Sequence, residues 1–391
     1  MRLKECLNGS SHKSGKEKPV NPVTPVTPVT PVTLVTWQVS CGGIEKILAD
    51  YLTYLKDDID FTVYSLRKVD CNDNIFSGYT MNLRSGHNCN LILYGKFLFY
   101  ALRNRHRVFH LFNAGPIILL ILRMVKVKMI IYHIHGTIYW QKPWEKRIRE
   151  ILWHLALSKS NHLHKIRFLA NSEFSKKRFL EQISPRVYIN VLYNPIDISR
   201  FAPVEKKMIP GQAKKIVYVG RLVKGKNLFL WLDVAKYILK YFPQTMFTIV
   251  GDGNLRAELL RRIKTMGLEN HIEITGYIKD IEKIYQANDL LLFLSENESF
   301  GNVVVESVLT QTPVIASAIP SLKEIFINYP EFIVPLDFHI FESIIDRLNR
   351  YDALMESVIR ARKDFIQKFN LEKHIKLIKA FYHNIEKEIQ E

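Results

Sequence analysis

The sequence has 391 residues, 47% of them hydrophobic and 24% charged, which excludes a largely disordered chain and favours two domains of roughly 150 to 200 residues. Residues 1–200 carry 29 Lys and Arg against 14 Asp and Glu, a charge of +15, whereas residues 201–391 carry 26 against 24. The basic first half indicates an anionic partner for that half, such as a membrane surface, a lipid-linked phosphate or nucleic acid.

The sequence gives no signal for export, for a membrane span or for a metal site. The N-terminus lacks the apolar core of a signal peptide, and the longest apolar stretch, Ile117 to Val125, is far shorter than the roughly 20 residues that span a bilayer. The four cysteines form no CxxC pair near histidines, which argues against a zinc site and a disulfide framework. We expect a cytoplasmic protein, soluble or peripheral at the inner face of the plasma membrane.

The chain begins with a polar, basic segment that leads into the triplet repeat PVTPVTPVTPVT, which ends at Thr33. Proline at every third position favours an extended, solvated conformation over a folded one. We therefore expect residues 1–33 to form a disordered tail and the first domain to begin at Leu34.

From Leu34 onward, short β-rich runs alternate with helical periodicities, which is typical of a parallel sheet with crossover helices. Before a linker at 203–211, the predicted strands cover 34–40, 61–66, 108–112, 129–133, 167–170 and 188–192. After it they cover 215–220, 248–253, 272–277, 290–295 and 313–317. The pattern predicts an α/β protein of two Rossmann-like domains, 34–202 and 203–365, with helices over 366–391 that pack on both lobes. Ligands of such sheets bind at the carboxyl ends of the strands, here in the cleft between the domains.

Two features of the first half could reach this cleft. The pair Gly42-Gly43 follows a strand, where glycines either make a tight turn or let the backbone approach a ligand. His135 ends a strand and precedes Gly136, whereas His110 and His133 lie in similar settings without a following glycine. A lone histidine there is more often packed than catalytic, although histidine is a good hydrogen-bond donor near neutral pH.

The segment from Lys96 to Phe112 interleaves aromatic residues with Arg103, Arg105 and Arg107. It is either a patch that binds anionic lipid or a buried aromatic face with solvated arginines, and the second arrangement is the more common one for a single segment. A second candidate of the same kind runs from Trp140 to Arg149.

Cations follow the first strand of the second half. Arg221 and Lys226 bracket a loop that contains Gly225. Two positive charges there could bind one diphosphate and stabilise the charge that develops on a nucleotide leaving group, in place of a metal ion.

The most informative segment runs from Glu296 to Ser317, directly after the strongest predicted strand. If a helix begins near Gly301, the backbone amides at its positive end form an anion site. These amides belong to Phe300, Gly301, Asn302 and Val303. Glu298 would project toward sugar hydroxyls, while Glu306, about one turn into the helix, could reach a ribose diol. Alone, two such glutamates more often mark a solvated helix face, but the strand, the glycine turn and the cations favour a sugar-nucleotide site.

These motifs resemble glycosyltransferase family 4, whose members have the GT-B fold. Glu298 and Glu306 match the family's carboxylate pair with seven residues between them, and Arg221 and Lys226 match its R-x4-K element. The turn from Val250 to Gly253 and the strand TPVIAS are also similar. The likeness is specific over residues 215–325 and weaker over the rest of residues 34–390.

In the first half, the glycine turn and the His135-Gly136 pair resemble family landmarks, as do Ala170-Asn171-Ser172 and the segment from Asn194 to Phe201. Two departures stand out. Pro195 lies where the family often has glycine, and the triplet repeat occupies the place of a short leader into the first strand.

The resemblance implies a retaining transfer of a sugar from a nucleoside diphosphate sugar to an acceptor hydroxyl, with no metal and no cofactor. By that analogy Glu298 contacts the donor sugar, Glu306 contacts the ribose, and His135 touches the sugar or its leaving oxygen. Arg221 and Lys226 hold the diphosphate. Gly43, Gly251 and the amides from Phe300 to Val303 complete the expected donor site. No residue is assigned as a covalent nucleophile.

Family habit and the basic first half imply a glycan acceptor, lipid-linked, in lipopolysaccharide or capsule assembly. Rival enzymes of the same architecture are a nucleotide-sugar epimerase and a glycogen-synthase-type polymerase. A nucleic-acid-binding protein would need a zinc-finger spacing or a helix-turn-helix signature, and we find neither. A non-catalytic scaffold is disfavoured by the complete set of site residues.

Overall fold

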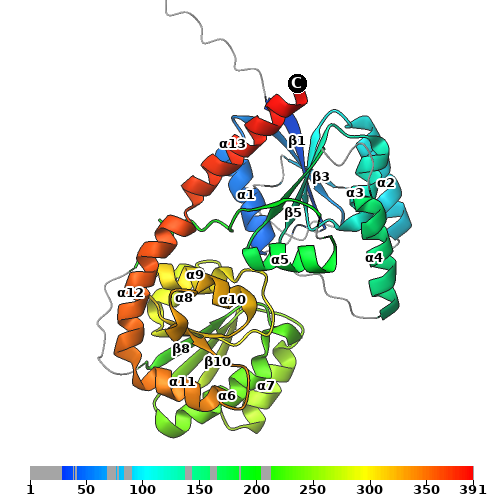
Figure 1. Cartoon of the computed structure of the whole chain (residues 1–391). Helices are drawn as coiled ribbons and strands as arrows, with labels where there is room; N and C mark the ends of the chain where they lie inside the picture. Colours follow the sequence, from blue (N-terminus) through cyan, green and yellow to red (C-terminus); the bar gives the residue numbers. More distant parts are fainter. Residues whose placement is uncertain are drawn as a thin grey trace, which may run out of the picture.

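The computed structural model shows two parallel β-sheets, each covered by helices, that form an N-terminal and a C-terminal lobe (Figure 1). Every pairing between neighbouring strands is parallel. The predicted α/β fold of two Rossmann-like lobes is confirmed. The structure describes residues 29–37, 39, 42–67, 76, 79–82, 90–136, 143–158, 165–184, 186–203 and 213–390.

The N-terminal sheet has seven strands in the order β3-β2-β1-β4-β5-β6-β7. Its central strands β4 and β5 are buried along their whole length, as expected for a parallel sheet covered on both faces. The strands are β1 (Val29–Thr36), β2 (Ile59–Ser65), β3 (Thr80–Asn82), β4 (Val108–Phe112), β5 (Met129–Ile134), β6 (Ile166–Ala170) and β7 (Ile189–Val191). The helices are α1 (Gly43–Leu55), α2 (Asn90–Arg103), α3 (Gly115–Val125), α4 (Pro143–Leu157) and α5 (Glu173–Gln182).

The C-terminal sheet has six strands in the order β10-β9-β8-β11-β12-β13, and it contains the larger hydrophobic core. The strands are β8 (Lys215–Val219), β9 (Met246–Val250), β10 (Ile272–Gly276), β11 (Leu290–Phe293), β12 (Val314–Ser317) and β13 (Ile333–Val334). The helices are α6 (Leu228–Tyr241), α7 (Arg256–Thr265), α8 (Ile281–Ala287), α9 (Asn302–Leu309), α10 (Pro320–Ile325), α11 (Ile340–Asn349) and α12 (Tyr351–Lys368).

The chain returns to the N-terminal lobe at its C-terminal end. Helix α12 lies on the C-terminal lobe, and α13 (Leu371–Gln390) then runs up the side of the N-terminal lobe (Figure 1). Ile378, Tyr382 and Ile385 of α13 are buried in the N-terminal core. The expected boundary between residues 365 and 366 is therefore wrong, because it falls inside α12, and the true change of lobe comes between α12 and α13.

The expected start of the first domain at Leu34 is also wrong. Strand β1 begins at Val29, inside the triplet repeat, and Val32 and Thr33 are fully buried. The buried guanidinium of Arg107 donates to Thr33 Oγ1 at 3.0 Å and to the Val32 carbonyl at 3.2 Å. Valine and threonine suit a sheet, and Pro31 is tolerated where the register of β1 against β2 shifts, between Val29 and Val32. Residues 1–28 of the expected tail lie outside the described residues.

Three buried histidines, His110, His133 and His374, connect α13 to the N-terminal sheet. Tyr382 Oη lies 2.6 Å from His110 Nδ1, and His110 Nε2 lies 3.3 Å from His133 Nδ1. His374 Nδ1 donates to the Tyr193 carbonyl at 3.0 Å, so the neutral ring accepts at Nε2 from Tyr51 Oη at 2.9 Å. Burial lowers the pKa of His374 to about 4, and it lowers the pKa of His110 and His133 well below the ordinary value.

These histidines should make the fold acid-sensitive. They are neutral in the folded chain, whereas each binds a proton in the unfolded chain below pH of about 6.5. The free energy of unfolding should therefore decrease as the pH falls from about 6.5 toward 4, by up to about 1.4 kcal/mol per pH unit for each histidine. Urea unfolding measured at several pH values tests this. His374→Gln should flatten the dependence, and the same change at the exposed His339 should leave it unaltered.

Candidate active site

One cleft of about 750 Å³ lies between the two lobes, at the carboxyl ends of both sheets. All eleven residues predicted for the donor site line it. They are Gly43, His135, Arg221, Lys226, Gly251, Glu298, Phe300, Gly301, Asn302, Val303 and Glu306.

Two helix N-termini approach each other across this cleft. Helix α1 of the N-terminal lobe begins at Gly43, and α9 of the C-terminal lobe begins at Asn302. A Cβ atom on Gly43 would lie 3.1 Å from Asn302 Nδ2, a tight contact that the Asn302 side chain would have to relieve by a small shift. The first N–H groups of each helix have no partner within the helix, and both macrodipoles present their positive ends here. The arrangement forms an anion site from both lobes.

The turn into α9 also depends on a glycine. Gly301 has φ of 106°, and a Cβ atom there would lie 2.8 Å from Leu322 Cδ2. Phe300 is 1% exposed and packs against Phe369, so only its backbone is available to a ligand. Asn194 Nδ2 donates to Asn302 Oδ1 at 3.0 Å, which fixes the first side chain of α9 against the N-terminal lobe.

Lys226 pairs with Glu298 at the other side of the anion site. Their ion pair joins Nζ to Oε1, and each side chain is 15% exposed. Arg221, five residues earlier, is exposed on the same loop after β8. The two predicted cations and the first predicted carboxylate are thus brought together.

Gly251 supports this loop by close backbone packing. It has φ of 140°, and a Cβ atom there would lie 1.9 Å from the Gly220 carbonyl oxygen. Gly253 has the same relation to Leu222, with a Cβ-to-oxygen distance of 2.4 Å. The glycine turn after β9 therefore lets the loop that carries Arg221 lie directly on it.

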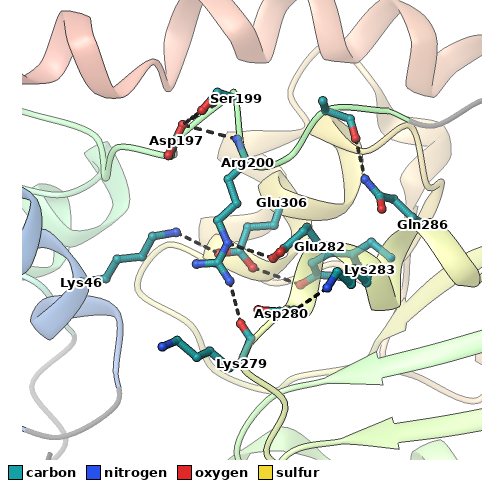
Figure 2. Close-up of polar contacts among 12 residues, drawn as sticks. Lys46, Asp197, Ser199, Arg200, Lys279, Asp280, Glu282, Lys283, Gln286 and Glu306 are labelled. Carbon is teal, nitrogen blue, oxygen red and sulfur yellow. Dashed lines mark hydrogen bonds and ion pairs between the residues drawn. The ribbon is translucent and has the colours of Figure 1, made fainter. Parts of the chain in front are cut away.

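Glu306 is 7% exposed and has partners from both lobes. Tyr285 Oη donates to its Oε2 at 3.1 Å, and Lys46 Nζ of α1 lies 3.6 Å from its Oε1 (Figure 2). Sequence reasoning missed Lys46, although its spacing carried a signal. It lies three positions after Gly43, on the same face of α1.

Arg200 is a second residue that sequence reasoning missed. Its Nε donates to Glu282 at 2.8 Å, and its guanidinium also donates to the Lys279 carbonyl at 2.6 Å (Figure 2). Arg200 and Lys279 both line the cleft. These bonds tie the segment that joins the lobes to the loop between β10 and α8.

His135 is the only one of the three strand-end histidines that lines the cleft. Its backbone N–H donates to Asn113 Oδ1 at 2.8 Å, and its carbonyl accepts from Ser299 Oγ of the other lobe at 2.8 Å. Burial lowers its pKa to about 3, with a further contribution from His374, so the ring is neutral near pH 7. Within the described part of the chain, its buried Nε2 has no hydrogen-bond partner. A neutral ring with an unpartnered nitrogen can donate or accept one further hydrogen bond.

Further hydrogen bonds hold the lobes together beside the site. Ser172 Oγ donates to the Ser299 carbonyl at 2.8 Å. The carboxylate of Glu324 accepts from the backbone N–H groups of Glu173 and Phe174 at 2.8 and 2.6 Å, at the N-terminus of α5. Ser299 stands between Glu298 and α9, so these contacts position the donor-side residues relative to the N-terminal lobe.

The described residues offer neither a metal-binding cluster nor a membrane-spanning helix. No group of three or more His, Cys, Asp or Glu side chains in them could hold a metal ion. Among the same residues, no helix is long and apolar enough to cross a membrane.

Curated proteins of bacterial polysaccharide synthesis are similar to this chain. The Vi polysaccharide biosynthesis protein VipC/TviE of Salmonella typhi is 30% identical over 149 residues, which are 38% of this chain and 25% of that protein. The UDP-Gal:alpha-D-GlcNAc-diphosphoundecaprenol alpha-1,3-galactosyltransferase of Escherichia coli is 28% identical over 207 residues, 50% of this chain and 54% of the relative. The chain thus spans a quarter of the first relative and about half of the second.

Solved structures share the whole architecture. Anabaena Alr3699/HepE in complex with UDP and glucose has a TM-score of 0.70 at 17% identity and covers 90% of this chain and 99% of its own. WaaG, described as a glycosyltransferase involved in lipopolysaccharide biosynthesis, has a TM-score of 0.68 at 16% identity, with 89% and 99% covered. These likenesses show the fold.

Two family models match the chain in succession. Residues 41–200 match Glycosyltransferase Family 4, and residues 200–350 match Glycosyl transferases group 1. Their junction at residue 200 coincides with the passage from one lobe to the other. With both lobes matched and the GT-B architecture in place, the chain belongs to the family 4 and group 1 glycosyltransferases.

Proposed function

We propose that this protein transfers a sugar from a nucleoside diphosphate sugar to a hydroxyl of a glycan acceptor, with retention of the anomeric configuration. One observation carries the proposal: two helix N-termini and two cations converge on one cleft, which the carboxylates Glu298 and Glu306 also line. The helix N-termini and the cations suit a diphosphate, and the carboxylates suit the hydroxyls of a sugar and a ribose.

The diphosphate would lie between the start of α9 and the loop that carries Arg221 and Lys226. Lys226 then exchanges its ion pair with Glu298 for a phosphate oxygen, which leaves the carboxylate free to accept hydrogen bonds from the donor sugar. As the bond to the anomeric carbon breaks, both cations and the helix amides stabilise the charge that develops on the leaving diphosphate. Because these groups supply the positive charge, the reaction as proposed uses no metal and no cofactor.

The ribose would be held by Glu306, which Tyr285 orients from the core side. Lys46 already lies beside this carboxylate, so we assign it to the donor site as a third cation, contributed by the N-terminal lobe. His135, neutral and open at Nε2, would hydrogen-bond to the sugar or to its leaving oxygen.

The acceptor is proposed from the names of two relatives and from the basic N-terminal lobe. One relative is named for a diphosphoundecaprenol-linked substrate, and another for polysaccharide synthesis. We propose that the acceptor is a lipid-linked glycan of lipopolysaccharide or capsule assembly. The protein would reach it in the cytoplasm, with its basic N-terminal lobe at the inner face of the plasma membrane. An epimerase or a glycogen-synthase-type polymerase of the same fold would differ in product, as an isomerised sugar nucleotide or a long glucan.

The donor-side residues can be tested with UDP-, GDP-, ADP- and CMP-sugars in the presence of EDTA and lipid-linked acceptors. One donor should release its nucleotide. Arg221→Ala and Glu298→Gln should each lower kcat by about 10²- to 10³-fold, because each removes a contact to the reacting groups. Lys224→Ala changes an exposed cation of the same loop and should retain full activity. No release from any donor by folded protein, or equal effects of all three changes, would contradict the proposal.

Lys46 gives an independent test of the lobe arrangement. Lys46→Met should weaken binding of the product nucleotide diphosphate by about five- to tenfold, as expected for the loss of one partly exposed charge contact. Lys56→Met, an exposed lysine just past the other end of α1, should bind normally. Isothermal titration calorimetry measures both. Unchanged binding by Lys46→Met would remove this residue from the donor site without affecting the assignment of Arg221.

A further inference from the structure

Helix α2 presents an apolar face to solvent as well as to the core. On its inner side Leu93, Phe97 and Ala101 are buried under the sheet. Its exposed positions are Leu91, Ile92, Gly95, Leu98, Phe99, Leu102 and Arg103. Six of these seven residues carry no polar side chain, and Leu91 is 81% exposed. A helix that is apolar on all sides is normally covered by other parts of a protein or by a membrane, so we expect a partner to cover this face.

Two neighbouring helices extend the face. Helix α3 packs between α2 and α4, and the three lie on the same side of the N-terminal lobe (Figure 1). Met124 at the end of α3 is 76% exposed. On α4 the exposed side chains of Ile148, Ile151 and Leu155 are three and four residues apart and form one stripe. We call the exposed residues of these helices the α2–α4 surface.

The charge of this region is strongly positive. Residues 90–158 contain eleven Lys and Arg against two Glu. The Arg103 guanidinium lies 4.0 Å from the centroid of the Phe99 ring, so a cation and an aromatic ring share one spot on the α2–α4 surface. Arg147 and Lys126 are exposed on α4 and at the end of α3. The partner must therefore accept apolar side chains and positive charge together.

The structure separates the two interpretations of the segment from Lys96 to Phe112. Phe97 belongs to the core, and Arg107 is buried with an ion pair to Asp60 at 3.0 Å, so these residues serve the fold. Phe99 and Arg103 remain on the outside. Of the candidate from Trp140 to Arg149, residues 140–142 lie outside the described residues, and only the later part of α4 contributes here.

We propose that the α2–α4 surface docks onto an anionic lipid bilayer, with the apolar face of α2 inserted at headgroup depth and the cations against lipid phosphates. An amphipathic surface with aromatic, aliphatic and basic side chains has this affinity, and each cation near an anionic leaflet adds to it. The role of this docking in the reaction rests on the lipid-linked acceptor proposed above. Vesicle binding needs neither donor nor turnover, so the two proposals can fail separately.

Gly95 offers a clean variant, because a Cβ atom there would meet no atom within 4 Å. Gly95→Asp places a negative charge in the middle of the apolar face without a clash, and Gly95→Ala is its uncharged control. Co-flotation of the full chain with phosphatidylethanolamine and phosphatidylglycerol vesicles at 3:1 is the measurement. Wild type and Gly95→Ala should bind, and Gly95→Asp should bind at least about tenfold more weakly. Neutral phosphatidylcholine vesicles should bind much less of every protein.

Two double variants test the contribution of the exposed apolar side chains. Phe99→Ser with Leu102→Ser should abolish flotation. Phe338→Ser with Ile327→Ser removes apolar groups that are more exposed still, from the C-terminal lobe, and should not reduce it. Wild type that stays unbound with anionic vesicles would overturn the proposal. It would also be overturned by a dimer in light scattering that Gly95→Asp dissociates, since the surface would then join two copies of this chain.

Discussion

The close approach of α1 and α9 is the constraint on which the site depends. Two helix N-termini with unpaired N–H groups repel each other electrostatically unless an anion or a polar group lies between them. Here Gly43 faces the side chain of Asn302, which Asn194 holds in turn. The absence of a side chain on Gly43 leaves room for this approach, and the interlobe hydrogen bonds of Ser299 and Glu324 hold the lobes in place. The cleft is therefore built around a place for negative charge before any ligand arrives.

The positive charge at these helix ends also explains why the two carboxylates of the site lie here in ion pairs. Glu298 and Glu306 lie close to this positive region, and each has a lysine beside it, one from its own lobe and one from the other. A donor that brings its own phosphates and hydroxyls can replace both ion pairs at once. Under the proposed function the site would exchange internal contacts for contacts with the donor, and no carboxylate would lose all its partners during the exchange.

Much of the fold and of the site could be predicted because its signals are local. The strand, glycine turn and helix around Gly301 are continuous in sequence, and so are Arg221 and Lys226. Contacts between distant segments could not be predicted. The pairing of Lys46 with Glu306 depends on the placement of two lobes, and the return of α13 depends on which core its apolar face meets. Composition led to a wrong prediction at β1. Its prolines favour a solvated tail, whereas the buried Arg107 anchors the strand in the sheet.

Because β1 is built partly from the triplet repeat, a change in the number of triplets bears on the start of the folded lobe. The strand takes its first five residues, Val29 to Thr33, from the last copies of an identical triplet. If one copy were gained or lost, the neighbouring copy would supply the same side chains in the same order, and every residue from Val29 onward would keep its partners. The start of β1, an interior strand of the sheet, is therefore insensitive to changes in copy number so long as two triplets remain. A tract of this kind can vary in length between individuals of a lineage while the folded chain that follows it is unaltered.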